Sequence, residues 1–349
     1  MFKFEVIKTA IKNNNADAFL LLNDTNRFWL TGFESSFGII IVTINKIYLF
    51  LDMRYYQKAV DNIKSQDIEI IVFKGYNQIV EKIQELSIDR LLVEKESFLI
   101  QDFLKYKDYI KTIIPFNGDI LRIQKTDDEI QKLQRAADIA SETLEWIKDK
   151  LVPGVTEIQI ANMLTSHMLE LGASKNSFEP IVASGPNGAY PHHHPTNRVI
   201  ENNEFVTIDM GCIYEGYCSD ITRTFAIGTP DSKLIDAYNK VYESNEKGIQ
   251  SIKHKMLGKE VDNICREVID NSEFNGYFVH STGHGVGINV HELPNVSSAY
   301  DKPLEHNSII TIEPGIYIPG LGGIRIEDMV LVKNDNNHVV LTTASKIKF

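Results

Sequence analysis

Four acidic residues lie inside apolar runs of the sequence, at positions where a hydrophobic side chain would be expected. Each run is rich in β-branched residues, which indicates a buried strand. Buried charges of one sign are heavily penalised unless other charges compensate them. The pattern therefore predicts cations among these carboxylates, which belong to Asp209, Asp220, Glu313 and Glu327.

The first two acids belong to a predicted hairpin. Two strand-like runs flank Glu215-Gly216, a suitable two-residue turn. With this turn, Asp209 faces Thr222, and Asp220 points to the same side of the hairpin as Asp209. Such diagonal neighbours lie about 7–8 Å apart at the backbone. The pair either holds a cation, for which Gly211 opposite Asp220 leaves room, or forms two exposed acids on a solvent face.

A histidine among glycines completes the set of candidate ligands. His284 lies in Gly283-His-Gly-Val-Gly287, and glycines beside an imidazole imply a close approach of other backbone. His280 lies four residues earlier, but the Ser-Thr-Gly between them argues against a helical HxxxH zinc site. Pro314 interrupts the strand that carries Glu313, so the register between this strand and the one that carries Glu327 stays open.

The ligand types, four carboxylates and one imidazole, indicate which metal ions this site would prefer. Hard oxygen donors with one nitrogen favour Mn²⁺, Co²⁺, Fe²⁺ or Zn²⁺ over a thiolate-type zinc site. Two divalent cations would cancel four negative charges. A pair of such ions, about 3.5–4 Å apart, can polarise a carbonyl group for hydrolysis. The sequence therefore predicts a two-metal hydrolytic site.

Length and composition bound the class of protein. With 349 residues, two domains are expected, because single cores seldom exceed roughly 250–300 residues. A net charge of -11 argues against nucleic acid as the main partner, since that role needs a basic surface. The three cysteines have no CxxC spacing and suit a reducing compartment. Neither a signal peptide nor a membrane-spanning run is recognisable, so we expect a cytoplasmic protein with no membrane partner.

The order of predicted elements indicates two domains of different class. Residues 1–124 alternate strands and helices, which is typical of an α/β domain. Residues 125–349 contain two tandem units, each a helix pair followed by a strand-rich stretch. The first pair begins at the capping box Thr126-x-x-Glu129, and the second, at about 231–271, is interrupted at Gly258. This order predicts an α+β domain with pseudo-duplicated helix pairs on a mostly antiparallel sheet, and a cleft between the halves.

At these residues the chain resembles the proline-specific members of the methionine aminopeptidase–prolidase–creatinase superfamily. The resemblance covers essentially the whole chain, and residues 1–124 resemble the creatinase-type N-terminal domain through Trp29-Leu-Thr-Gly-Phe33 and Leu51-Asp-Met-Arg-Tyr55. It implies a pita-bread catalytic domain, a curved antiparallel sheet covered by helix pairs. The five metal-ligand motifs occur in order: Ile-Asp209-Met-Gly, Ser-Asp220-Ile-Thr-Arg-Thr, Thr-Gly-His284-Gly-Val-Gly, Glu313-Pro-Gly-Ile-Tyr and Arg-Ile-Glu327-Asp.

The resemblance also implies roles for individual residues. Asp209 would chelate one metal ion and His284 with Glu313 the other, while Asp220 and Glu327 would bridge the two. Glu313 would also shuttle the proton. The further residues that the resemblance implies are the catalytic histidines His192 and His291 and the substrate-binding residues His280 and Arg325. His193 and His194 follow His192, and for these two we expect solvated loop positions.

The expected function is hydrolysis of the Xaa-Pro bond at the N-terminus of peptides that have proline in the second position. This bond is a tertiary amide without an N–H group, so a metal ion must supply the polarisation that a backbone hydrogen bond cannot. The close alternative is an Xaa-Pro dipeptidase, which must also cap the free carboxylate of its substrate. The remote alternative is a non-enzymatic peptide-binding module. The resemblance further implies a homodimer.

Overall fold

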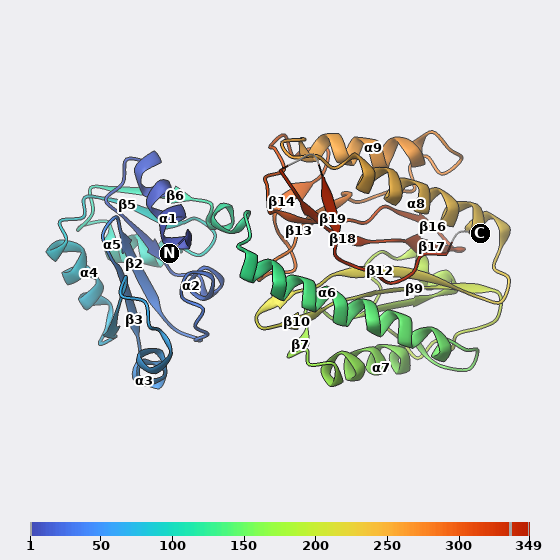
Figure 1. Ribbon diagram of the computed structural model, residues 1–349, viewed down its shortest axis with the longest axis horizontal. Helices are drawn as coiled ribbons and strands as arrows, with labels where there is room; N and C mark the ends of the chain where they lie inside the picture. Colours follow the sequence, from blue (N-terminus) through green and yellow to red (C-terminus); the bar gives the residue numbers. More distant parts are fainter. Residues whose placement is uncertain (1, 335–336, 348) are drawn as a thin grey trace. The chain divides into compact units, whose positions relative to one another are not determined.

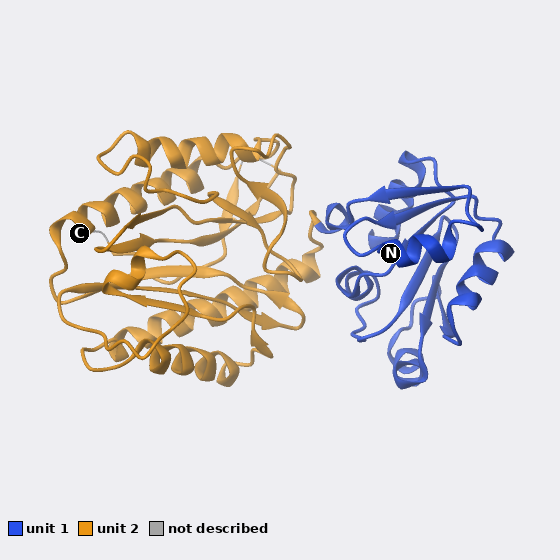
Figure 2. Ribbon diagram, turned by 180° about the vertical axis from the view of Figure 1, so that it is seen from behind, with its two compact units in different colours: residues 1–122 blue, residues 123–349 orange. Residues whose placement is uncertain are grey.

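The computed structural model describes residues 2–334, 337–347 and 349. The chain divides into two compact units, Met1–Arg122 and Ile123–Phe349, which Figure 2 colours separately. No helix within the described part of the chain is long and apolar enough to cross a membrane.

The N-terminal unit is an α/β domain with a mixed six-stranded sheet in the order β4-β3-β2-β1-β5-β6 (Figure 1). Strands β1, β2 and β3 pair antiparallel, whereas β4, β5 and β6 pair parallel to their neighbours. The strands are β1 (Ala18–Leu21), β2 (Ile39–Thr43), β3 (Ile47–Leu51), β4 (Ile68–Val72), β5 (Arg90–Glu94) and β6 (Thr112–Phe116). The helices are α1 (Phe2–Asn13), α2 (Asp24–Thr31), α3 (Met53–Asn62), α4 (Tyr76–Glu85) and α5 (Ile100–Tyr106).

The C-terminal unit begins with a helix pair. Thr126 caps helix α6 (Asp127–Ile147), and its hydroxyl and backbone N–H pair with the backbone and side chain of Glu129, which confirms the predicted capping box. Thr156 caps α7 (Glu157–Glu170) in the same way through Gln159. The strands that follow are β7 (Lys175–Asn176), β8 (Ile181–Ser184), β9 (Glu204–Met210), β10 (Cys212–Tyr214), β11 (Tyr217–Cys218) and β12 (Ile221–Ile227).

The second half repeats this order. Helices α8 (Ser232–Ser251) and α9 (Gly258–Asp270) precede the second group of strands. Gly258 was expected to interrupt the helices, but it is the first residue of α9. A side chain is excluded at this position because a Cβ would collide with the carbonyl of Asn295. The strands are β13 (Gly283–Gly285), β14 (Glu292–Val296), β15 (Ile309–Ile312), β16 (Gly315–Ile318), β17 (Gly322–Arg325), β18 (Asp328–Val332) and β19 (His338–Val340).

Apolar faces of the helices pack on the antiparallel strands in both halves. Buried residues of α6 and α7 share one core with β8, β9 and β12, while α8 shares a core with β16 and β17. In Figure 1 the two helix pairs lie along opposite sides of this unit with the strands between them. The predicted α+β arrangement of tandem helix pairs on antiparallel strands is therefore confirmed.

Candidate metal centre

A cavity of about 740 Å³ lies in the C-terminal unit and brings together the residues singled out in the sequence. Its volume is within the usual range of small-ligand sites. All five candidate ligands line it, namely Asp209, Asp220, His284, Glu313 and Glu327. It is also lined by the candidate catalytic and substrate-binding residues His192, His280, His291 and Arg325.

Strands β9 and β12 place the two aspartates. Asp209 pairs with Thr222 across the hairpin, which confirms the predicted register. The expectation for Gly211 is wrong. A Cβ at this position would collide with the Ser219 carbonyl oxygen and the Ser177 hydroxyl, so the glycine serves the close approach of backbone and leaves no room for an ion.

The two glutamates lie where neighbouring strands change partners. Ile312 pairs with Asp328, and Gly315 pairs with Arg325, so Glu313 and Glu327 face each other between two short ladders. The N–H of Glu313 donates to the Thr282 carbonyl (2.8 Å), and the N–H of Glu327 donates to the Thr222 carbonyl (3.1 Å). These bonds to other strands turn both side chains into the cavity. The sequence left this register open because Pro314 interrupts the ladder.

The imidazole of His284 joins the two halves of the cluster. Its Nε2 atom lies 3.5 Å from Asp220 Oδ2 and 3.4 Å from Glu313 Oε1. Nδ1 lies 3.1 Å from the Gly285 carbonyl oxygen, a partner that leaves Nε2 unprotonated and available as a ligand. The flanking glycines serve close backbone packing as expected, because a Cβ at Gly283 would meet the Thr311 carbonyl.

Several side chains of the cluster have pKa values that are shifted toward the neutral form of the group. Burial raises the pKa of Glu313 to about 8, with the charge of Asp209 adding to the effect and Arg325 opposing it. Burial together with the neighbouring carboxylates also raises the pKa values of Asp220 and Glu327 well above their usual range. Burial lowers the pKa of His284 to about 4, so its ring is neutral at pH 7 and available to a metal ion.

Unsatisfied oxygen atoms show that a cation fits. Asp209 Oδ1 and Glu327 Oε1 are buried and have no hydrogen-bond partner, although buried polar atoms in proteins nearly always have one. One ligand atom from each of Asp220, His284 and Glu327 lies within 4.8 Å of the others. Hard oxygen donors, a neutral imidazole and uncompensated negative charge together meet the requirements of divalent cations.

Arg325 supplies the positive charge that the cavity does contain. Its Nη2 atom donates to Asp209 Oδ2 at 2.6 Å, and Nη1 donates to the Tyr317 hydroxyl at 2.8 Å. Tyr317 in turn lies 2.8 Å from Nε2 of His280, whose Nδ1 lies 2.8 Å from the Ser281 carbonyl. Sequence reasoning did not single out Tyr317, although it stands in the Glu-Pro-Gly-Ile-Tyr motif.

The histidine run after Pro191 divides into three environments. The exposed residue His192 lines the cavity, and His194, with 81% of its side chain exposed, places Nδ1 3.1 Å from Glu179 Oε2. The expectation of a solvated position is wrong for His193. Only 10% of its side chain is exposed, and its Nε2 lies 2.9 Å from Oε2 of the buried Glu157.

Glu157 is a second residue that the sequence did not reveal. Its carboxylate also accepts hydrogen bonds from the Ser184 and Thr196 backbone N–H groups (2.8 and 3.0 Å) and from three further side-chain donors. Burial acts to raise the pKa of Glu157, but the bond from His193 and the other donors outweigh it and lower this pKa to about 2. Glu157 therefore fixes both ends of the segment 184–196, which carries His192.

Comparison with known proteins agrees with this geometry. Residues 131–334 match metallopeptidase family M24, and residues 4–124 match the creatinase/prolidase N-terminal domain. The chain belongs to metallopeptidase family M24. It is 46% identical over 341 residues to a protein of Mycoplasma genitalium that is provisionally named an Xaa-Pro aminopeptidase, covering 96% of this chain and 95% of that one.

Solved structures of M24 peptidases share the fold of this chain. The Xaa-Pro dipeptidase of Bacillus anthracis is 37% identical, with a TM-score of 0.94 over 99% of this chain and 98% of that one. The prolidase of Pyrococcus horikoshii is 32% identical, with a TM-score of 0.90 over the whole of both chains. The predictions of a pita-bread metallopeptidase and of a creatinase-like N-terminal domain are thus confirmed.

Proposed function

We propose that this M24 peptidase is an Xaa-Pro aminopeptidase with two divalent metal ions per chain. The observation that carries the proposal is the convergence of four carboxylates and a neutral imidazole in one cavity, where the protein compensates only part of their charge. Membership of a metallopeptidase family and relatives named as Xaa-Pro aminopeptidase and Xaa-Pro dipeptidase support metal-dependent cleavage of Xaa-Pro bonds.

Within this proposal the five ligands divide between two ions. Asp209 would hold one ion and His284 with Glu313 the other, and the unsatisfied oxygen of Glu327 fits a bridging role beside Asp220. The donors suit Mn²⁺ first, with Co²⁺, Fe²⁺ or Zn²⁺ as alternatives. When bound, these ions supply Lewis-acid polarisation of the scissile carbonyl and lower the pKa of water.

The residues of the chain supply proton transfer and orientation. The proline nitrogen must be protonated to leave, and the carboxyl group of Glu313, which lines the cavity, would carry that proton. His192 and His291 line the same cavity and would assist with their imidazole groups. His280 would contact the substrate, while Arg325 would hold Asp209 and present its charge at the proline end.

The charge of the cavity favours an aminopeptidase over a dipeptidase. A dipeptidase must bind the free carboxylate of Xaa-Pro, which needs a cation that no other group neutralises. Among the described residues that line the cavity there is no lysine, and the one guanidinium, Arg325, is paired with Asp209. Burial lowers the pKa values of His280 (to about 4) and His291, so neither provides that cation at pH 7.

A comparison of two substrates tests the proposal. Ala-Pro and a longer Ala-Pro peptide are offered to the protein after reconstitution with Mn²⁺, Co²⁺ or Zn²⁺. We expect release of alanine from the longer peptide with the higher kcat/KM. Turnover of the dipeptide alone would instead identify an Xaa-Pro dipeptidase. Turnover of neither substrate with any metal would favour a peptide-binding module.

Two further properties belong to the proposal. Three buried free thiols support a reducing, cytoplasmic location. A homodimer is supported by the apolar surface of the N-terminal unit, where α5 exposes 81% of Ile100 and 56% of Leu104. Such exposed apolar neighbours are typical of contact surfaces.

A further inference from the structure

The segment 341–347, which follows β19, crosses the C-terminal unit behind the metal centre. At one end it contacts α6, where the N–H of Thr343 donates to the Ser141 hydroxyl (2.9 Å). At the other end it contacts α8 through Lys346, whose ammonium group lies beside Asn245 and Glu246. The segment therefore joins the helix pairs of the two halves.

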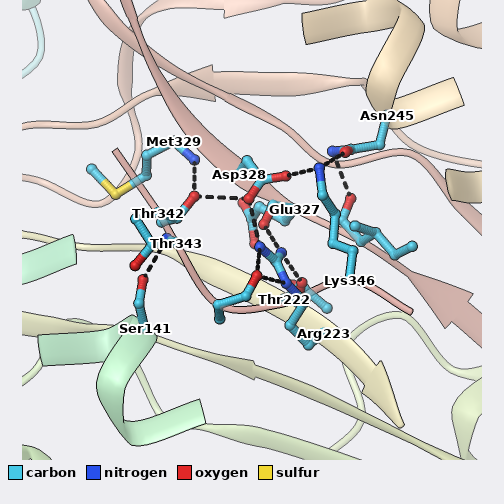
Figure 3. Close-up of polar contacts among 12 residues, drawn as sticks. Ser141, Thr222, Arg223, Asn245, Glu327, Asp328, Met329, Thr342, Thr343 and Lys346 are labelled. Atoms are coloured by element: carbon cyan, nitrogen blue, oxygen red, sulfur yellow. Dashed lines mark hydrogen bonds and ion pairs between the residues drawn. The ribbon is translucent and has the colours of Figure 1, made fainter. Parts of the chain in front are cut away.

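The three N–H donors of Lys346 have three partners. They are Asn245 Oδ1 at 3.0 Å and Asp328 Oδ2 at 3.1 Å, both drawn in Figure 3, and Glu246 Oε1. Only 17% of the Lys346 side chain is exposed. An ammonium group whose three N–H groups all donate to protein acceptors is held in one position, and it holds these acceptors in place in turn.

Two partners of Lys346, Asn245 and Asp328, are linked to the backbone beside candidate metal ligands. The Asn245 side-chain amide donates to the Ile312 carbonyl (2.9 Å) and to the Ile326 carbonyl (3.4 Å). These residues directly precede Glu313 and Glu327. Asn245 is fully buried, so its amide ties the two facing strands together at the point where both glutamates leave their ladders.

Asp328, the other partner, directly follows Glu327 and binds Arg223. The two side chains form a buried ion pair at 2.6 Å. All five N–H groups of Arg223 are used. They reach Asp328, the carbonyls of Thr222 and Glu327, and twice the carbonyl of Ala344, which lies in the crossing segment. The segment thus supports both neighbours of Glu327 in the chain. It reaches Ile326 through Lys346 and Asn245, and it reaches Asp328 through Lys346 directly and through Ala344 and Arg223.

We propose that Lys346 is a positioning residue for the metal centre, which fixes the backbone of Glu313 and Glu327 from behind through Asn245 and Asp328. The inference rests on the proposed two-metal function. Groups that orient the ligands of a metal typically change its affinity about 10–100-fold when they are removed.

Metal binding to purified, metal-free protein tests the role of Lys346. Wild type, Lys346→Met and the control Lys247→Met are titrated with Mn²⁺ by calorimetry and with Co²⁺ by visible absorption. Lys247 lies on the same helix as Asn245, with 55% of its side chain exposed. We expect Lys346→Met to bind at least one ion about 10–100-fold more weakly, with a changed Co²⁺ spectrum. Lys247→Met should match wild type.

The outcomes separate this inference from the proposed function. If wild type binds two ions and Lys346→Met binds both with unchanged affinity and spectrum, the role of Lys346 is overturned while the metal centre stands. If wild type binds less than one ion, both are overturned. Should Lys346→Met fail to fold, Lys346→Gln keeps a hydrogen-bond donor on a slightly shorter side chain. For Lys346→Gln we expect a smaller loss of affinity, and unchanged binding would overturn the role.

Discussion

Among the individual residues that line this cavity, negatively charged side chains outnumber positively charged ones. Four carboxylates face one another, and Arg325 is the guanidinium that the described lining sets against them. Burial, together with the charge of neighbouring carboxylates, raises the pKa values of Asp220, Glu313 and Glu327. Side chains in this state have two ways to become neutral, by binding protons or by binding metal ions. The chemistry of the site depends on which of the two occurs.

Replacement of Glu313 tests the role of its carboxyl group. Glu313→Gln keeps the shape of the side chain but removes a charge from the cluster, together with the carboxyl group that we propose exchanges the proton. We expect kcat on an Ala-Pro peptide to fall about 10²–10⁴-fold, with an unchanged circular dichroism spectrum. Glu305→Gln, in a surface pair with Lys255, is the matched control. Near-normal activity of Glu313→Gln would show that the role is assigned wrongly.

The stability of the metal-free protein should depend on pH. A glutamate whose folded pKa is about 8 stabilises the fold fully below its unfolded pKa of about 4.3, and this contribution is lost as pH rises through 8. His284 acts in the opposite sense, but only between about pH 4 and the unfolded value of about 6.5. Above pH 6.5, only the carboxylate effect should remain.

Urea unfolding with a chelator measures this effect. Between pH 6.5 and 8, the free energy of unfolding of the metal-free protein should fall by up to about 1.4 kcal/mol per pH unit for each proton released. Saturating Mn²⁺ should remove this slope, because the ions replace the protons. A metal-free stability that is flat or rises across this interval would contradict the assignment of the raised pKa values.

Among the elements, the segment 184–196 shows how a loop that lines the cavity is held. It carries His192, and the buried carboxylate of Glu157 at the start of α7 binds it at Ser184, Asn187, His193 and Thr196. A carboxylate has only acceptors, which matches these donors. An amide in its place turns an NH₂ group toward donors and leaves buried groups unsatisfied.

Glu157→Gln should therefore displace the loop and lower the activity. We expect the free energy of unfolding to fall by about 1–3 kcal/mol, and kcat/KM to fall about tenfold. Thermal unfolding and steady-state kinetics check the two effects separately. Glu170→Gln, on the same helix with 74% of its side chain exposed, should change neither. If Glu157→Gln has full kcat/KM, the loop does not depend on this carboxylate.

The elements also show which features the sequence could predict. The hairpin that carries Asp209 was placed in register from its turn residues alone, because a two-residue turn fixes which residues pair. The register of Glu313 and Glu327 could not be predicted, since their strands exchange partners at Pro314. The site of His193 was predicted wrongly because its partner, Glu157, lies 36 positions earlier and no local pattern links the two.

At the scale of the whole molecule, the site is assembled from the two repeated halves of the C-terminal unit. Asp209 in β9 and Asp220 directly before β12 come from the first half, and His284, Glu313 and Glu327 come from the second. The sequence predicted both halves from helix caps and strand patterns, but their pairing across the cavity is a long-range property. A site assembled in this way exists only when the two halves pack together, so binding of metal and folding of this unit should be linked.

The proposed homodimer is a prediction for the intact chain. Static light scattering at micromolar concentration should give twice the chain mass of 39.6 kDa. A second measurement on Ile100→Lys tests the contribution of α5, whose exposed apolar side chains support the proposal. We expect that charge to weaken the dimer, because an unpaired ammonium group would be buried in the contact. A wild-type monomer at this concentration would contradict the prediction.

The central claim is that the buried carboxylates of the cavity hold two cations. Anomalous diffraction from crystals grown with Mn²⁺ tests it most directly, because the signal locates the metal itself. We predict two anomalous peaks about 3.5–4 Å apart. One should lie against Asp209 and the other against His284 and Glu313. The absence of any peak in the cavity, or peaks only at the molecular surface, would contradict the account.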